Sequence, residues 1–401
     1  MGDSSSQITL DDPFEHFDNS IAGDVRDPYP ELAGLRETTP VLEVAGDAAV
    51  PPNFVVSRYD DVARVLLDGE TFSSSMLAAV MGPAMGEHII LGMDEPEHRR
   101  HRALVGTAFR QKMLVRWESD LVRRVVDELI DTFVDAGRAE LVRQFTFQFP
   151  AQVIGGVLGL PREDFPQFQV WASAIISVNS AWERGMAASA ALKEYLAGVL
   201  AERRAHPRDD LVSDLAVAEL DGERLDDEEI FSFLRLLLPA GVETTFRSSG
   251  NFIYALLTHP DQLDALRLER SLMPQAIEEA LRWEPPLLIT SRVVTRDTEV
   301  RGTPIPAGAN VTVMLGAANR DPDRYRDPDR FDIFREPKQH ISFGHGPHMC
   351  LGMHLARMET RVAIGALLDR LPNLRLDPEG NDPHIHGQIF RSPTALPALF
   401  D

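Results

Sequence analysis

Apolar residues recur every three to four positions over much of this chain, which is the spacing that places them on one face of a helix. The clearest example covers residues 111–137, where the apolar stripe runs from Leu114 and Trp117 to Phe133 and Gly137 ends the pattern. We interpret this stripe as core packing. Similar patterns predict helices from Tyr59 onward, over 97–109, through 146–200 with breaks at Pro161 and Pro166, over 273–286, and after Gly352.

The longest predicted helix begins at Asp226 and ends at Thr258, before a His-Pro pair. Asp226 and Glu229 have the spacing of a capping box. At 1.5 Å per residue the helix would be about 50 Å long, enough to cross the molecule. Pro239 and Gly241 both disfavour a helix interior, so the sequence predicts a kink there.

An acid stands next to a hydroxyl at this weak point, in Glu243 and Thr244. Such a pair can pass protons, because a carboxylic acid and a hydroxyl both donate and accept them. A purely structural kink is the alternative.

The remaining segments predict a minor β region and two irregular stretches. Residues 289–322 alternate apolar and polar side chains between turns, which predicts a small antiparallel sheet, and residues 386–393 predict a hairpin with Ile389 and Phe390 at its tip. We expect a short strand within 51–58, an extended lead-in over 1–50 that is poorly ordered over 1–25, and a long loop over 77–98. The fold class is therefore mainly α with a minor β region.

Composition narrows the class of protein. The chain has 401 residues, 44% hydrophobic content and a formal net charge of −22, which favours solubility and argues against a nucleic-acid partner. No apolar run approaches the roughly 20 residues that span a bilayer, and the polar, acidic N-terminus is not a signal peptide. A single cysteine fits a reducing cytoplasm, where we expect the protein to reside.

That cysteine, Cys350, lies in the glycine-rich stretch FGHGPHMCLG (343–352). A lone cysteine is a buried apolar residue, a nucleophile or a single sulfur ligand, since it can form neither an internal disulfide nor a multi-cysteine metal site. The glycines let the backbone pass close to a flat group, and the helix that follows favours negative charge at its N-terminus. Both features favour the sulfur ligand over a structural turn.

This stretch resembles the haem-binding loop of the cytochrome P450 family, F-G-x-G-x-H-x-C-x-G. All six fixed positions match: Phe343, Gly344, Gly346, His348, Cys350 and Gly352. The resemblance implies one cytochrome P450 domain over 1–401, with haem b as cofactor and the Cys350 thiolate as the iron ligand.

Other family motifs follow in order along about residues 55–395. The resemblance implies that His98 and Arg102, in the match to D-x-P-x-H-x-x-x-R, bind haem propionates together with Arg292 and His348. It also implies that Ala240, Gly241, Glu243 and Thr244 form the oxygen-binding turn of the long helix, where the last two deliver protons. Glu279 and Arg282 match a structural E-x-x-R motif, for which Arg330 is expected to supply a further arginine.

The alignment with the family also suggests a substrate pocket. Because its residues are mostly apolar, we expect a mostly apolar small-molecule substrate. The candidates are Met85, Ile90, Leu236, Ala240, Leu288, Thr290 and Phe390.

The implied activity is insertion of one oxygen atom from O2, as hydroxylation, epoxidation or demethylation, by a soluble bacterial-type monooxygenase that we expect to be monomeric. Electrons would come from a separate ferredoxin-type donor, for which a basic patch is a candidate docking site. This patch consists of Arg99, Arg100, His101, Arg110 and Lys112. A peroxide-driven peroxygenase and a non-catalytic haem-binding protein are the alternatives. A hydrolase is disfavoured because the chain has no G-x-S-x-G motif.

Overall fold

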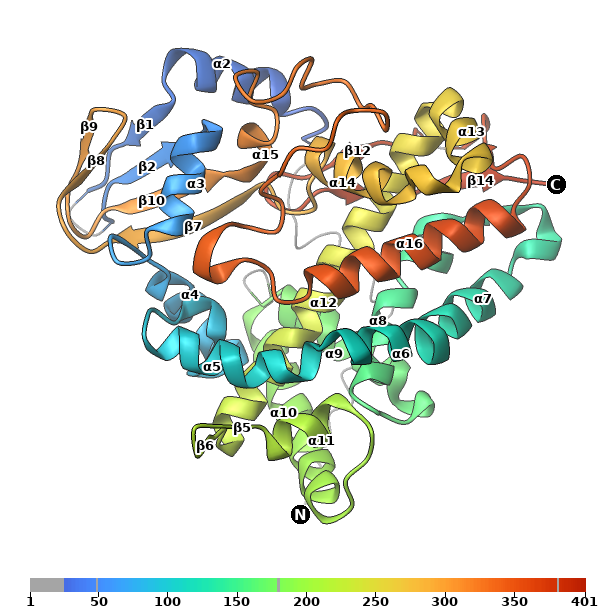
Figure 1. The fold of residues 1–401 in the computed structure, drawn as a ribbon, viewed down its shortest axis with the longest axis horizontal. Helices are drawn as coiled ribbons and strands as arrows, with labels where there is room; N and C mark the ends of the chain where they lie inside the picture. Colours follow the sequence, from blue (N-terminus) through green and yellow to red (C-terminus); the bar gives the residue numbers. More distant parts are fainter. Residues whose placement is uncertain (1–24, 48–49, 179–180, 381) are drawn as a thin grey trace.

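A computed structural model describes residues 25–401 apart from 48–49, 179–180 and 381. Helices dominate, and Figure 1 shows them filling most of the molecule with a sheet at one side. In chain order the helices are α2 (Tyr29–Thr38), α3 (Tyr59–Leu67), α4 (Ser75–Met85), α5 (Glu97–Gly106), α6 (Gln111–Trp117), α7 (Arg123–Asp131), α8 (Phe149–Val157), α9 (Phe165–Ile176), α10 (Trp182–Ala205), α11 (Leu211–Val217), α12 (Asp227–Thr258), α13 (Pro260–Leu268), α14 (Met273–Trp283), α15 (Leu315–Ala318) and α16 (Met353–Arg370).

The largest sheet has five strands in the order β1-β2-β10-β7-β3. Its strands are β1 (Val41–Val44), β2 (Asn53–Val56), β3 (Phe72–Ser73), β7 (Ile289–Val294) and β10 (Asn310–Met314). β10 pairs antiparallel with β7, as predicted, but it also pairs parallel with β2, which joins two segments about 260 residues apart in the chain. The mainly α fold with a minor β region is confirmed.

The smaller β elements among the described residues are one three-stranded sheet and several two-stranded pairs. A three-stranded sheet joins β11 (Arg375–Leu376), β14 (Pro397–Leu399) and β4 (Arg138–Glu140). Two-stranded pairs are formed by β5 (Glu219–Leu220) with β6 (Glu223–Arg224) and by β8 (Thr298–Val300) with β9 (Thr303–Ile305). The predicted hairpin near the C-terminus is confirmed as β12 (Ile385–His386) and β13 (Ser392–Pro393).

Helix α12 is the long helix that the sequence predicts. Asp226 and Glu229 form a full capping box, in which each side chain accepts from the other residue's backbone N–H at 2.8 Å. The helix continues through Pro239, so the disfavoured turn does not end it. In Figure 1, α12 passes behind α16 through the middle of the molecule, and most of its side chains are buried.

Two segments differ from the sequence-based expectation. The lead-in predicted over 1–50 contains helix α2 and strand β1, while residues 1–24 lie outside the described residues. The loop predicted over 77–98 contains most of α4 and the short 3-10 turn η1 (Ile90–Gly92). Both predictions were wrong. The apolar residues in these segments are only weakly periodic, and tertiary packing orders them, as α4 shows by packing against β7 and η1.

The E-x-x-R motif also needs one correction. Arg282 forms a buried ion pair with Glu279, as expected, at 2.7 and 2.8 Å. The further arginine is Arg335, whose Nε donates to Glu279 Oε1 at 3.2 Å. Arg330 contributes its backbone carbonyl, which accepts from Arg282 and Arg335. The expected role of the Arg330 side chain was therefore wrong. Among the described residues, no helix has the length and apolar character needed to cross a membrane.

Candidate active site

The loop that carries Cys350 is shaped by two left-handed glycines. Gly344 and Gly346 have φ values of 74° and 71°, which side chains rarely adopt. A β-carbon on Gly346 would lie 2.8 Å from the backbone of Leu66 at the end of α3, so this position also needs a glycine for space. The Cys350 N–H donates to Phe343 O at 2.8 Å and closes the loop.

Cys350 as a whole residue is exposed and lies just before α16, for which Gly352 is the N-cap. Desolvation of the thiol group itself nevertheless raises its pKa. The Gly352 backbone N–H, Arg102 and Arg357 act in the opposite direction. These groups favour the thiolate, which is the form that binds a metal.

Four basic side chains come together beside this loop: His98, Arg102, Arg292 and His348. We call them the basic cluster. The rings of the two histidines lie 4.0 Å apart between centroids. Burial, reinforced by the positive charge of the other three members, lowers the pKa of His348 to about 3. Burial also lowers the pKa of Arg292 to about 10, although Asp94 opposes this change.

The two arginines of the basic cluster lack acidic partners, whereas His98 Nδ1 lies 3.3 Å from Glu95 Oε1. Within the described residues no carboxylate lies at ion-pair distance from Arg102 or Arg292, whose recorded hydrogen bonds go to the backbone carbonyls of Met349 (2.6 Å) and Ser291 (2.8 Å). His98 Nε2 is buried without a hydrogen-bond partner. Buried charges normally have a counter-charge, so this arrangement suits an anionic ligand.

Across from these residues, α12 presents one accessible face. In an otherwise buried stretch, Leu237, Gly241 and Thr244 are half-buried and Ala240 is exposed. Their spacing of three and four places them on one side of the helix. Leu237, which sequence reasoning missed, could have been found from this spacing relative to Ala240 and Thr244.

The predicted proton pair is divided between two environments. Thr244 lies on the accessible face, and its hydroxyl donates to Ala240 O at 2.7 Å. Glu243 is buried and forms an ion pair with Arg247, with both nitrogen–oxygen distances at 3.2 Å. Burial raises the pKa of Glu243 to about 7, although Arg247 acts against this. The side chains of Glu243 and Thr244 project about 100° apart around the helix, so one can be buried while the other stays accessible.

The accessible turn of α12 lies beside the helix that follows the cysteine loop. α12 contacts α16, and the Thr245 hydroxyl hydrogen-bonds to the buried carboxyl of Glu359 on α16. The helix that follows the thiol therefore packs against the helix with the open face, and the basic cluster lies beside the cysteine loop. These residues fit haem, which needs a metal ligand on one side and partners for two propionates.

Apart from Ala240, which lies on the accessible face of α12, the six other predicted pocket residues have different surroundings. Met85, Ile90 and Leu236 are buried in the main core. Thr290 is half-buried on β7, and Phe390 is half-buried with Arg247 above its ring at 5.6 Å. Leu288 packs in a separate small core with Tyr29, Leu32 and Ala317, and its assignment to the pocket stays a prediction.

The predicted basic docking patch was also wrong in part. Arg100 forms ion pairs with Glu223 and Glu229, and His101 is buried against Glu229. Arg110 and Lys112 remain exposed, and Arg99 is exposed although it pairs with Glu95.

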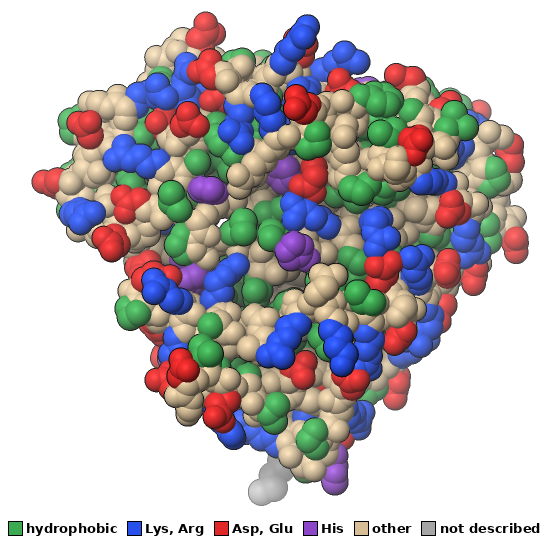
Figure 2. All heavy atoms as spheres, viewed as in Figure 1, with side chains coloured by type: hydrophobic (Ala, Val, Ile, Leu, Met, Phe, Trp, Pro, Cys, Tyr) green, Lys and Arg blue, Asp and Glu red, His purple; other side chains and the backbone are tan. Residues whose placement is uncertain are grey.

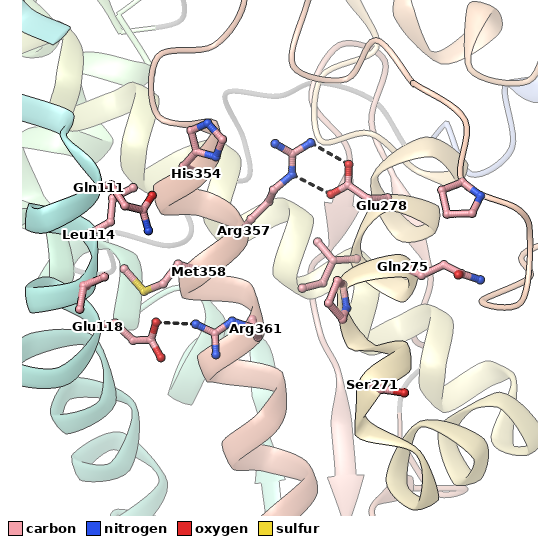
Figure 3. Close-up of a pocket in the computed structure, with 14 residues that line it drawn as sticks. Gln111, Leu114, Glu118, Ser271, Gln275, Glu278, His354, Arg357, Met358 and Arg361 are labelled. Carbon is pink, nitrogen blue, oxygen red and sulfur yellow. Dashed lines mark hydrogen bonds and ion pairs between the residues drawn. The ribbon is translucent and has the colours of Figure 1, made fainter.

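A groove of about 610 Å³ lies close to the cysteine loop, between α6, α14 and the first turns of α16. Figure 3 shows His354, Arg357 and Arg361 of α16 along this groove, with Arg357 paired to Glu278 and Arg361 to Glu118. Figure 2 shows that Lys and Arg side chains alternate with acidic ones on this face of the molecule.

Comparisons with known proteins agree with this site. The family model described as cytochrome P450 matches residues 160–395. Cytochrome P450 107B1 of Saccharopolyspora erythraea is 37% identical over 91% of this chain and 92% of its own length. The vitamin D(3) 25-hydroxylase of Pseudonocardia autotrophica is 38% identical over 88% of each chain.

The fold agrees with solved structures as well. CYP109E1 from Bacillus megaterium in complex with testosterone has a TM-score of 0.85 and 32% identity, and the match covers 94% of this chain and 99% of that chain. Members of this family use haem b, and the named relatives are monooxygenases, so the alternative of a non-catalytic haem-binding protein does not hold. The chain belongs to the cytochrome P450 family and is a P450 monooxygenase.

Proposed function

We propose that the protein inserts one oxygen atom from O2 into a mostly apolar small molecule, with two electrons from a ferredoxin-type donor. The observation that supports this most strongly is the accessible face of α12, where Ala240 and Thr244 remain open beside the cysteine-bearing region. The face is mainly apolar with one hydroxyl, which suits a substrate of the same character.

In this proposal Cys350 is the iron ligand, the basic cluster binds the propionates, and the loop residues Phe343, Gly344 and Gly352 shape the backbone around the sulfur. Ala240 leaves space on the accessible face of α12 because its side chain is small. Gly241 instead lets α12 approach α8 closely, since a β-carbon there would lie 2.6 Å from Ile154 Cδ1. Haem b, when bound, supplies the dioxygen chemistry, while the protein supplies binding, orientation and electrostatics.

Thr244 and Glu243 are proposed to move protons in sequence rather than as a contacting pair. The Thr244 hydroxyl lies on the open face, where it can hold a proton that water resupplies. Glu243, with a pKa raised to about 7, can both release and accept a proton near neutral pH. Its ion pair with Arg247 would have to open or exchange partners during turnover.

Thr244→Ala tests this role and discriminates between the two haem-dependent activities. A monooxygenase variant should consume NADPH but release hydrogen peroxide in place of product. A peroxide-driven peroxygenase should respond little, since it does not need protons to be delivered to dioxygen. Unchanged product per NADPH in the variant would contradict the proposal.

We further propose that ferredoxin docks at the groove beside the cysteine loop. Arg110 and Lys112 are exposed next to this groove and form no ion pair among the described residues, so an acidic partner would meet positive charge there. Lys112→Glu should lower ferredoxin-supported turnover and its salt dependence. Arg99→Glu serves as the matched control, because Arg99 is already paired with Glu95.

The relatives suggest substrates for a first screen. Named proteins of similar sequence include an erythromycin C-12 hydroxylase and a mycinamicin IV hydroxylase/epoxidase, and CYP109E1 has been solved with testosterone. We propose that macrolides and steroids be titrated first, with the low- to high-spin shift as the readout.

We also propose that the protein is a monomer with a single domain over 1–401. This proposal predicts one cooperative thermal transition.

A further inference from the structure

A second group of metal-binding side chains lies outside the haem region. His88, in the segment between α4 and η1, meets Glu97 and His101 from the first two turns of α5. One ligand atom from each lies within 4.8 Å of the other two. The rings of His88 and His101 are nearly parallel, at an interplanar angle of 8°. Two imidazoles and a carboxylate form a typical zinc ligand set.

His101 is held in the orientation and tautomer that a metal ligand needs. Its Nδ1 lies 3.2 Å from the carbonyl O of Glu97, and a carbonyl can only accept, so Nδ1 carries the hydrogen. In the neutral ring the lone pair is then on Nε2. A metal-bound histidine usually donates its other nitrogen to a carbonyl or carboxylate in this way.

His101 Nε2 has one close polar neighbour, the carboxylate of Glu229, which can pair with it only when a cation lies between them. It is buried and makes no hydrogen bond, although it lies 2.8 Å from Oε1 of Glu229. The lone pair on Nε2 and the carboxylate repel each other at this distance unless a cation lies between them. That cation is either a proton or a metal ion. Glu229 and Glu97 place negative charge around the group, and Arg100 offsets part of it.

We propose that His88, Glu97 and His101 bind a divalent cation with a preference for imidazole, with Zn²⁺ as the best match. In a tetrahedral site with metal–ligand bonds near 2.0–2.1 Å, the ligand atoms are about 3.4 Å apart. Side-chain rotations that move these atoms by roughly 1 Å would therefore complete the site. Glu229 supplies a neighbouring negative charge, and water can occupy an open position.

The ion would clamp the segment 86–92 to α5. This segment follows Met85 at the end of α4 and contains Ile90, and His101 lies against Glu229 in the first turn of α12. Metal binding would thus restrain a connection between three helices that surround the proposed pocket. The ligands come from a loop and a helix, so the restraint depends on the metal.

The test uses the haem-loaded full chain and Zn²⁺ with a competing chromogenic chelator. Wild type should bind one Zn²⁺ per chain, and the zinc K-edge absorption, which is separate from that of iron, should report two imidazole nitrogens and one or more oxygens. His88→Ala and Glu97→Gln should each weaken binding at least about tenfold. His384→Ala is the matched control, because it removes a histidine from another histidine–carboxylate pair, with Asp382 at 3.7 Å.

Hydrogen exchange tests the clamp separately. Zn²⁺ should slow exchange of the backbone amides of 86–92 in wild type and in the His384→Ala variant, but not in the two site variants. The proposal is overturned if wild type binds no zinc, or if His88→Ala and Glu97→Gln bind it as wild type does. It is also overturned if only His384→Ala loses binding. Binding without slower exchange overturns the clamp.

Discussion

Arg247 Nε donates to Glu243 Oε1 at 3.2 Å across one turn of α12, and both side chains are buried. Arg247 Nη1 also donates to Ser392 Oγ at 2.7 Å, which connects α12 to the C-terminal hairpin. The acid that the family motif assigns to proton delivery is thus tied to a base rather than to the neighbouring Thr244. Because the pKa of Glu243 is raised to about 7, its carboxyl group is ionised in part of the molecules and neutral in the rest near pH 7.

Glu243→Gln should lower product formation by at least about tenfold, since general acid–base groups typically contribute a factor of 10² to 10⁴. Wild-type turnover should vary with pH around 7, where the carboxyl titrates, and the variant should lose that dependence. Product formed per NADPH, measured across this pH range at constant haem content, checks the prediction. A variant with the wild-type rate and pH profile would exclude Glu243 from the relay.

Arg292→Leu should speed haem loss by about tenfold or more, because charge-assisted hydrogen bonds contribute about 1.5–3 kcal/mol. The same change should not destabilise the haem-free protein, since Arg292 is a buried cation without an acid at ion-pair distance among the described residues. Transfer of haem to an excess of an acceptor protein measures the first effect and urea unfolding the second. Arg64→Leu, at an exposed position of α3, is the control and should change neither.

Arg335→Ala should lower the free energy of unfolding by about 3 kcal/mol, because it leaves part of the charge of the buried Glu279 uncompensated. Arg330→Ala should cost no more than about 0.5 kcal/mol, since only its backbone carbonyl is used. Urea unfolding of the two variants distinguishes these roles. If both variants lost equal unfolding free energy, or if Arg330→Ala lost more, Arg330 would be the further arginine of the E-x-x-R motif after all.

Glu359 should make stability fall as pH rises. Burial raises the pKa of this carboxyl from 4.5 to about 8, although the Thr245 hydroxyl opposes the change. Between these values the folded state keeps a proton that the unfolded state releases, so the contribution is full below pH 4.5 and is lost as pH rises through 8. Glu359→Gln should therefore flatten the decline in stability over this range.

Thermal unfolding of Glu359→Gln at several pH values checks this. The control is Glu183→Gln, at an exposed position of α10. If the Glu359→Gln variant declined with pH as steeply as wild type, the carboxyl would not be protonated in the folded state.

Sequence reasoning worked best where local signals agree. The capping box at Asp226 and the uninterrupted apolar pattern fixed α12, and the spacing around Cys350 identified the family, which the comparisons confirm. These features depend on residues close together in the chain. The roles expected for Cys350, the basic cluster, Glu243 and Thr244 remain predictions, although the structure brings the basic cluster together.

The sequence failed where contacts between distant segments decide the outcome. α4 was read as a loop because its composition is rich in glycine and methionine, and it is ordered by contacts with β7. Arg335 and Arg330 are five residues apart in an irregular segment, so no periodicity shows which side chain reaches Glu279. Arg100 and His101 looked like a free basic patch because their partner, Glu229, lies 128 residues or more away.

The most direct test of the account is the absorption spectrum of the reduced, carbon monoxide-bound protein, recorded for wild type and for Cys350→Ser. Wild type should show the long-wavelength Soret band of thiolate-ligated haem, and the variant should lose that band even when it retains haem. A colourless wild-type protein after haem supply, or the same thiolate-type band in Cys350→Ser, would contradict the assignment of this sulfur as the iron ligand.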